Sequence, residues 1–295
     1  MSPNLNTARS GSRPLAGRLG QPVKGHAHKI GTGFNAIHFS EDMFDGQMDP
    51  LIMVDHFVMT DPTFEPHLHA GISAVTFIFE DAVGDFLNRD TLGNNIALAP
   101  GDLYWLAAAR GAVHDERPDP KGARTHALQI FVNLPARLKA EPAHSLLVRG
   151  ADMPRLTGPG YQVRVALGEA GEGQGAHVGT QDFTLLDGAL SRGADFRHRL
   201  PGGQAAWIYA VSGDLQVEVE GERRVISAGS SVVAAADVGD SDLKLSGGDA
   251  HFVLMASPPL QEAFVKHGPL VMSSSADVRR TLADYAAGKF GKIAG

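Results

Sequence analysis

The chain has 295 residues, 43% hydrophobic and 20% charged, a balance typical of a globular protein with one large or two medium-sized domains. It contains no cysteine, which excludes a disulfide framework, a thiolate-held metal site and a cysteine nucleophile, and fits a reducing compartment. The formal net charge of −7 argues against general nucleic-acid binding. The 35 glycines and the scarcity of long helical patterns favour an all-β chain rich in turns.

The N-terminal segment is basic. Arg9, Arg13, Arg18, Lys24 and Lys29 precede the first acid, Glu41. We expect residues 1–20 to form a flexible, solvated arm. This segment lacks the apolar stretch of a signal peptide, and no run approaches the ~20 apolar residues of a membrane helix. A cytoplasmic location without membrane contact is therefore expected.

Apolar runs in the first half predict a series of short strands separated by turns. The expected strands are Ala74–Phe79, Asn95–Ala99, Leu103–Ala108 and Leu128–Leu134. Pro100-Gly101-Asp102 marks a turn between two of them, and Pro135 ends the last. Strands at this spacing indicate a sandwich or barrel.

The second half repeats the pattern weakly. The proline- and glycine-rich stretch Lys139–Gly160 is interpreted as the connection between two halves. Beyond it, strands are expected at Trp207–Val211 and Leu215–Val219, separated by Ser212-Gly213-Asp214, and a hairpin turn leads on to Val225-Ile226. Two antiparallel barrels of similar plan in tandem are the simplest architecture that fits this repeat.

One helix is expected, at the C-terminal end. Ser274 and Asp277 have the spacing of a capping box. Val278, Leu282 and Tyr285 then form one apolar stripe, and Gly288 ends the pattern. We expect this helix to pack on a barrel.

Two short motifs carry candidate metal ligands. In the strand-like segment His67-Leu68-His69, the two imidazoles point to the same face, because residues i and i+2 of a strand do so. His114-Asp115-Glu116 places an imidazole and a carboxylate on one face by the same rule. If the two segments lie on neighbouring strands, three nitrogens and one oxygen converge inside a barrel. Such a mixed site suits Fe, Mn, Co, Ni, Cu or Zn, so the ligands alone do not name the metal.

The order of motifs resembles that of the pirin family, whose fold is the bicupin. The segments that carry the resemblance are DPLIMVDHF from Asp49, PHLHAGISAVTF from Pro66, NRDTLGN from Asn88, PGDLYWLAAARGAVHDE from Pro100, LQIFVNLP from Leu128 and KHGPLVM from Lys266. The match is collinear from about Val23 and is strongest over Asp49–Pro135.

The resemblance implies an all-β bicupin of two jelly-roll barrels with a C-terminal helix. Residues 21–140 would form an N-terminal cupin that holds one metal ion, usually Fe(II), on His67, His69, His114 and Glu116. Residues 141–295 would form a C-terminal cupin that includes the helix. We expect no metal there, because no comparable His-x-His motif lies in the second half.

Five positions depart from the family pattern. Proline, arginine, an acid, histidine and glutamine of the family are replaced by Leu68, Ala70, Ser73, Asn88 and Tyr104. We expect all five to flank the metal pocket and to change its specificity while the metal site is retained. Residues that hydrogen-bond to metal ligands change the metal affinity by roughly 10- to 100-fold.

The family resemblance implies two functions. The first is a quercetin 2,3-dioxygenase acting on a flavonol or a related aromatic enol, with Glu116 as general base. The alternative is a metal- or redox-sensing protein that binds and regulates a transcription factor or metabolic enzyme. A cupin that keeps metal only for stability is a third possibility. A monomer is expected rather than an obligate oligomer, and no direct contact with nucleic acid.

The remaining histidines have simpler interpretations. His26 and His28 repeat the ligand spacing without an acidic partner, so we expect a surface pair. His56 is expected to make a structural hydrogen bond. His126 is expected to pack near the start of a core strand, and His267 to precede a turn.

Overall fold

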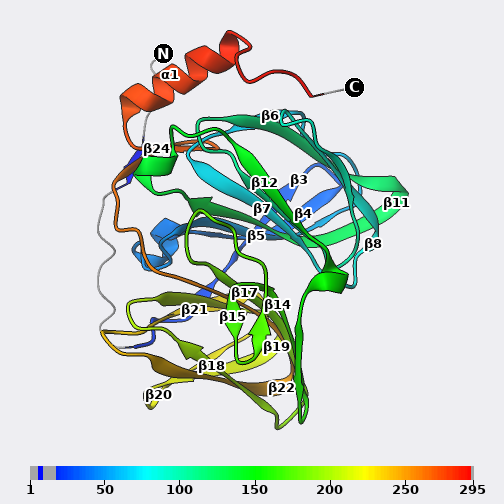
Figure 1. Cartoon of the computed structure of the whole chain (residues 1–295). Coiled ribbons are helices and arrows are strands. Elements are labelled where there is room, and N and C mark those ends of the chain that lie inside the picture. The colour runs from blue at the N-terminus through cyan, green and yellow to red at the C-terminus, as the bar shows by residue number, and fades with distance from the viewer. Residues whose placement is uncertain (1–5, 9–17, 294–295) are drawn as a thin grey trace.

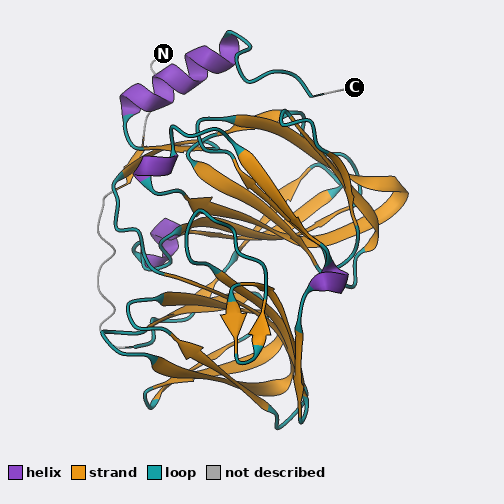
Figure 2. Ribbon diagram, viewed as in Figure 1, coloured by secondary structure: helices purple, strands orange, loops and turns teal. Residues whose placement is uncertain are grey.

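The computed structural model describes residues 6–8 and 18–293, which are mostly β-strand (Figures 1 and 2). Two strand-rich bodies lie one above the other, and helix α1 (Ser275–Ala286) covers the outer end of the upper one (Figure 1). The predicted fold class, two antiparallel barrels with a C-terminal helix, is confirmed.

The first barrel is built from a ten-stranded antiparallel sheet that folds around itself. Its strands are β3 (His26–Ile30), β4 (Phe34–Ser40), β5 (Leu51–Met59), β6 (His67–His69), β7 (Ile72–Ile78), β8 (Val83–Asp90), β9 (Asn95–Leu98), β10 (Leu103–Ala107), β11 (Ala112–Asn133) and β12 (His144–Val148). The first part of β11 pairs with β6 and β8, and its second part pairs with β5 and β7. Strand β11 therefore joins the two walls of the barrel.

The second barrel uses a nine-stranded sheet. Its strands are β2 (Val23–Lys24), β13 (Arg155–Gly158), β14 (Tyr161–Leu167), β17 (Thr184–Leu190), β18 (Asp195–Leu200), β19 (Ala205–Val219), β20 (Glu222–Ile226), β21 (Ser230–Ala235) and β22 (Ser241–Ser257). The expected break at Ser212-Gly213-Asp214 is wrong, because β19 runs through it and pairs with β22 on both sides. Gly213, at φ +71°, takes up the irregularity as a bulge within the strand.

Smaller elements complete the chain. They are β1 (Asn6–Ala8), β15 (Glu169–Ala170), β16 (Gly173–Gln174), β23 (Phe264–His267), β24 (Leu270–Met272) and the 3₁₀ turns η1 (Glu41–Phe44), η2 (Ala136–Leu138) and η3 (Gly150–Asp152). Helix α1 begins as predicted, because the Ser274 hydroxyl accepts a hydrogen bond from the Asp277 backbone N–H at 3.2 Å.

Both ends of the chain cross to the other barrel. Strand β2 pairs with β21, so residues before the first barrel extend the sheet of the second. Strands β23 and β24 and helix α1 pack instead on β6 of the first barrel, in an apolar layer that includes Leu68, Ala70 and Val278. Strand β12, which follows the boundary expected near residue 140, still pairs with β10 of the first barrel, so that boundary stays a prediction. Residues 1–5 and 9–17 of the expected basic arm lie outside the described residues.

The largest apolar cluster lies between the barrels. It joins Phe77 and Trp105 of the first barrel to Trp207, Tyr209 and Val253 of the second. Each large side chain buried in this way contributes about 1.5–3 kcal/mol to stability. The two barrels thus share one core.

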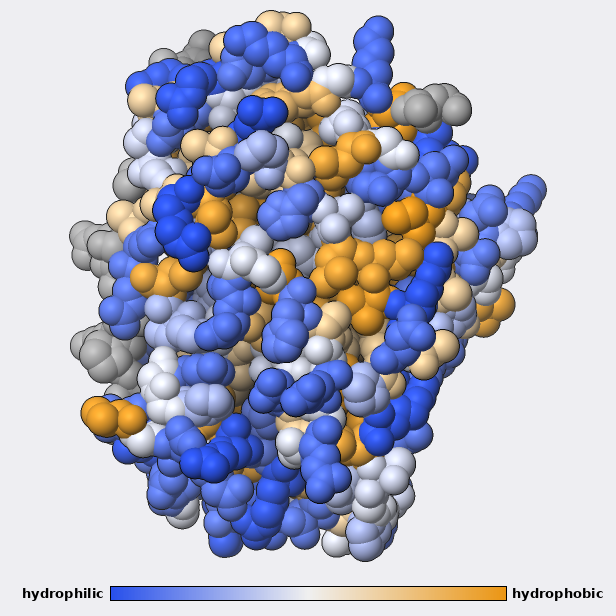
Figure 3. Space-filling model, viewed as in Figure 1, coloured by the Kyte–Doolittle hydropathy of each residue, from blue (hydrophilic) through white to orange (hydrophobic). Residues whose placement is uncertain are grey.

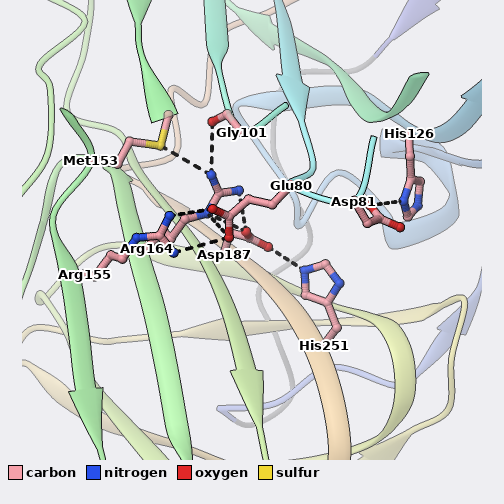
Figure 4. A network of polar contacts seen from close by, with 9 residues as sticks. All are labelled: Glu80, Asp81, Gly101, His126, Met153, Arg155, Arg164, Asp187 and His251. Atoms are coloured by element: carbon pink, nitrogen blue, oxygen red, sulfur yellow. Dashed lines mark hydrogen bonds and ion pairs between the residues drawn. The ribbon is translucent and has the colours of Figure 1, made fainter. Parts of the chain in front are cut away.

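A buried polar network stabilises the interface between the two barrels (Figure 4). Arg164 of the second barrel donates to Asp187 Oδ2 at 3.0 and 2.6 Å and to the carbonyl of Gly101 in the first barrel at 3.1 Å. Its guanidinium carbon also lies 5.1 Å from the centre of the Phe77 ring. His251 Nε2 donates to the other Asp187 oxygen at 2.6 Å. Arg164 therefore connects the two barrels through its hydrogen bond to Gly101 and its contact with the Phe77 ring, while its ion pair with Asp187 lies within the second barrel.

The face shown in Figure 3 is mostly hydrophilic, with apolar residues in small groups. Exposed large apolar side chains such as Val225 and Val238 come from separate parts of the chain. Isolated apolar residues of this kind are normal on protein surfaces. In the described part of the chain, no helix has the length and apolar character needed to span a membrane.

Candidate metal centre

Three histidines meet inside the first barrel because β6 pairs with the start of β11. In this register His67 lies opposite His114, and His69 lies opposite Ala112. One nitrogen from each ring lies within 4.8 Å of the other two. The closest pair is His69 Nε2 and His114 Nε2, at 2.9 Å. The strand pairing thus brings together His67, His69 and His114, which we call the histidine triad.

Burial keeps the triad uncharged. His69 and His114 are 1% and 2% exposed, whereas His67 is partly open to solvent. Burial, followed by repulsion from His67, lowers the pKa of His114 to about 3. Burial and the neighbouring rings also lower the pKa of His69 well below its usual value, and burial lowers that of His67. At neutral pH the three imidazoles are therefore uncharged, and each keeps a nitrogen lone pair that can bind a metal cation.

Hydrogen bonds behind the rings orient two of these lone pairs. His67 Nδ1 donates to the carbonyl of Glu65 at 2.9 Å, which leaves its Nε2 for the centre of the triad. His114 Nδ1 lies 3.4 Å from Asn88 Oδ1. His69 Nδ1 is buried, and the backbone of Pro269 opposes the lowering of that ring's pKa. Three neutral imidazoles that converge in this way fit a divalent transition metal.

Glu116 lies apart from the triad. It follows His114 by two residues on β11, so its side chain is on the same face. Its Oε1 accepts a hydrogen bond from the Thr76 hydroxyl at 2.5 Å, and it is not among the residues whose ligand atoms lie within 4.8 Å of one another. Burial raises the pKa of Glu116 to about 7, against the opposing effect of the Thr76 hydrogen bond. Its roles as fourth ligand and as base stay predictions.

The five departures from the family pattern have different surroundings. Leu68 and Ala70 pack under the C-terminal segment rather than against the metal pocket. The hydroxyl of Ser73 is buried without a partner, and Tyr104 donates to Asp90. Asn88 contacts a triad member, because its Oδ1 lies 3.4 Å from His114 Nδ1. The expectation that all five flank the pocket is therefore wrong for Leu68 and Ala70, because side chains alternate along β6.

Sequence reasoning missed two contributors to the site. Thr76 lies in the expected apolar strand Ala74–Phe79, but its hydroxyl holds Glu116. The segment after His267 is expected only to form a turn, but it lies beside the end of β6, where the Val271 N–H donates to the carbonyl of Ala70 at 2.9 Å. The buried Lys139 ammonium also donates to the carbonyl of Val271 at 2.6 Å. Both contributions depend on contacts between distant segments.

The other histidines largely follow their simpler interpretations. His26 and His28 are exposed on β3. His56 makes hydrogen bonds, as predicted, to Tyr209 and His126. His126 lies at the start of the buried part of β11, where it also bonds Asp81.

Comparisons with known proteins agree with this geometry. The family model described as "Pirin" matches residues 22–132, and "Pirin C-terminal cupin domain" matches residues 185–291. The chain is 32% identical over 275 residues to a Pseudomonas aeruginosa protein named "Putative quercetin 2,3-dioxygenase", covering 90% of this chain and 94% of the relative. It is 32% identical over 251 residues to pirin of Homo sapiens, covering 83% of each.

Solved structures share the fold. The structure of quercetin 2,3-dioxygenase from Acinetobacter baumannii superimposes with a TM-score of 0.82 at 24% identity, covering 94% of this chain and 99% of that one. The nickel(II) complex of the pirin YhhW from Escherichia coli gives a TM-score of 0.62 at 18% identity, covering 81% and 99%. Sequence and fold together show that this chain belongs to the pirin family.

Proposed function

We propose that this protein is a metal-dependent dioxygenase that opens the ring of a flavonol or a related aromatic enol. The observation that carries the proposal is the convergence of three neutral imidazoles on one point inside the first barrel. The relatives named as quercetin 2,3-dioxygenases, and the nickel ion in the Escherichia coli pirin, support the same assignment.

The metal would be held by His67, His69 and His114. A divalent transition metal there would bind the 3-hydroxyl and 4-carbonyl oxygens of a flavonol and favour its anion. Iron is the metal we propose first, and the ligand set also suits Mn, Co, Ni, Cu and Zn.

Glu116 is proposed as the base that takes the proton from the substrate hydroxyl. It is a buried carboxylate on the same strand face as His114, and Thr76 holds it in a fixed orientation. The anion then reacts with dioxygen, both oxygen atoms enter the product, and the heterocycle opens with loss of carbon monoxide.

The test is turnover of quercetin by protein loaded anaerobically with Fe(II) and then exposed to air. We expect loss of the quercetin absorbance with one carbon monoxide released per dioxygen consumed, and no turnover by His114→Ala. Glu116→Gln should bind metal but turn over at least roughly 100-fold more slowly, as expected when a general base is removed. Full metal loading without turnover would contradict the proposal and favour the regulatory alternative.

A further inference from the structure

One inner face of the first barrel carries a row of polar side chains, and the proposed reaction uses only Thr76 at its end. The strand register places His38 opposite Asp55, Asp55 opposite Gln129, and Gln129 opposite Thr76. Directly paired residues on neighbouring strands point to the same face of the sheet. His38, Asp55, Gln129 and Thr76 therefore form one continuous row across β4, β5, β11 and β7, named below the polar row.

The polar row faces the metal centre. Thr76, at one end, donates to Glu116 from the opposite wall, which also carries His114. Next to the row, Met53 lies opposite Phe131, and the Phe131 ring centre is 5.0 Å from that of His69. A molecule bound at the triad would thus have apolar side chains beside it and the polar row beyond them.

The row leads from solvent into the barrel. The side chains of His38 and Asp55 are 35% and 17% exposed, whereas Thr76 is buried. Met53, Phe131 and Gln129 are also partly exposed, although they lie on an inner face. Solvent therefore reaches this wall.

Folding alone does not account for the row. His38 Nδ1 donates to Asp55 Oδ1 at 2.6 Å, but a partly exposed pair of this kind adds only about 0–1 kcal/mol to stability. The second barrel, of the same plan, has an apolar core of residues such as Val165, Leu186 and Leu245. A barrel of this type can thus form without such a row.

We propose that His38, Asp55 and Gln129 recognise hydroxyl groups on a substrate of more than one ring. Its chelating end would lie at the triad and its rings on Met53 and Phe131. Asp55 and Thr76 are two strand spacings apart, or about 10 Å, which a single ring does not bridge but two or three linked rings do. This inference rests on the proposed function, because it places the chelating end at the metal.

Anaerobic binding of two flavonols tests the proposal. Quercetin and 3-hydroxyflavone have the same chelating oxygens, but only quercetin has hydroxyls on its other rings. In the metal-loaded protein, Asp55→Asn should weaken quercetin binding about 10-fold or more, as for loss of a hydrogen bond to a charged group, and change 3-hydroxyflavone binding less than about twofold. His38→Gln should act in the same direction.

Asp81→Asn is the matched control, because Asp81 also pairs with a histidine, His126, at 2.6 Å but is exposed and is not part of the polar row. It should leave both affinities unchanged. Metal content and the urea midpoint of each variant show whether it is folded and loaded.

The outcomes separate the two proposals. If the wild-type protein binds neither flavonol in a metal-dependent way, the proposed function fails and this inference with it. The wild-type protein could instead bind both flavonols, while Asp55→Asn and His38→Gln weaken binding of the two flavonols equally or not at all. The polar row then does not recognise the hydroxyl groups, and only this inference fails.

Discussion

The molecule contains two histidine clusters that differ in what their nitrogens contact. In the triad, ring centres lie 4.7 to 4.8 Å apart, and at the barrel interface those of His56 and His126 lie 4.9 Å apart. At the interface each histidine has a protein partner: His56 bonds Tyr209 and His126, His126 bonds Asp81, and His251 bonds Asp187 (Figure 4 shows the last two).

The difference teaches that close imidazoles alone do not make a metal site. No acid of the described residues bonds a triad histidine, whereas His126 and His251 at the interface each bond an aspartate. At the interface, the Tyr209 phenol of the second barrel bonds His56 of the first, and aspartates bond His126 and His251. The first cluster is thus expected to act on metal binding and the second on stability.

The largest expected effect is loss of metal on removing one triad member. His114→Ala should weaken Co(II) or Fe(II) binding by more than about 100-fold. Loss of a residue that only hydrogen-bonds to a metal ligand costs up to about that much, and this variant removes a ligand itself. His126→Ala, in the interface cluster, should bind metal as the wild-type protein does. The metal affinity of both variants is measured by titration and elemental analysis. Equal affinities would contradict the claim that only the triad binds metal.

Next in size is the effect of breaking the interface network. Arg164→Ala leaves Asp187 buried without its guanidinium partner and should lower the free energy of unfolding by about 3–5 kcal/mol. Arg197→Ala, which breaks an exposed pair with Asp242, should cost at most about 1 kcal/mol. Urea unfolding measures both, and metal content should stay the same. Equal losses of stability would contradict the role given to Arg164.

Acid should destabilise the metal-free protein through both clusters. Burial lowers the pKa of His114 and of His56 from the usual histidine value of 6.5 to about 3. Between pH 6.5 and 3 the unfolded chain therefore binds protons that the folded chain does not, so stability falls as pH falls. Each such histidine contributes up to about 1.4 kcal/mol per pH unit. Urea midpoints that do not decrease from pH 7 to pH 5 would contradict this account.

The smallest effect is expected at Asn88, behind His114. Asn88→Ala removes the acceptor 3.4 Å from His114 Nδ1 and should weaken metal binding by about 10-fold, the lower end of the usual range, because the contact is long. Asn88→Asp keeps an acceptor oxygen and should restore binding. A loss as large as that of His114→Ala would mean that Asn88 does more than orient the ring.

Local patterns in the sequence predict the strands, the two-barrel plan and the two histidine motifs, whereas the meeting of the motifs at one site is implied by the family resemblance and depends on the pairing of β6 with β11. His67 and His69 share a face because of strand alternation, and Ser274 caps the helix through a contact three residues away. The partner of Glu116 and the polar row were not predicted, because they depend on the register between strands distant in the chain. The crossing of both chain ends to the opposite barrel leaves no local signal either.

The most direct test of the central claim is a crystal structure of the Co(II)-loaded protein with anomalous data collected at the cobalt edge. We expect one anomalous peak, about 2.0–2.3 Å from a nitrogen of each of His67, His69 and His114, and none at His56, His126 and His251. The electron density of Glu116 would show whether it leaves Thr76 to become a fourth ligand. A peak at the interface cluster, or none at the triad after anaerobic loading, would contradict the claim.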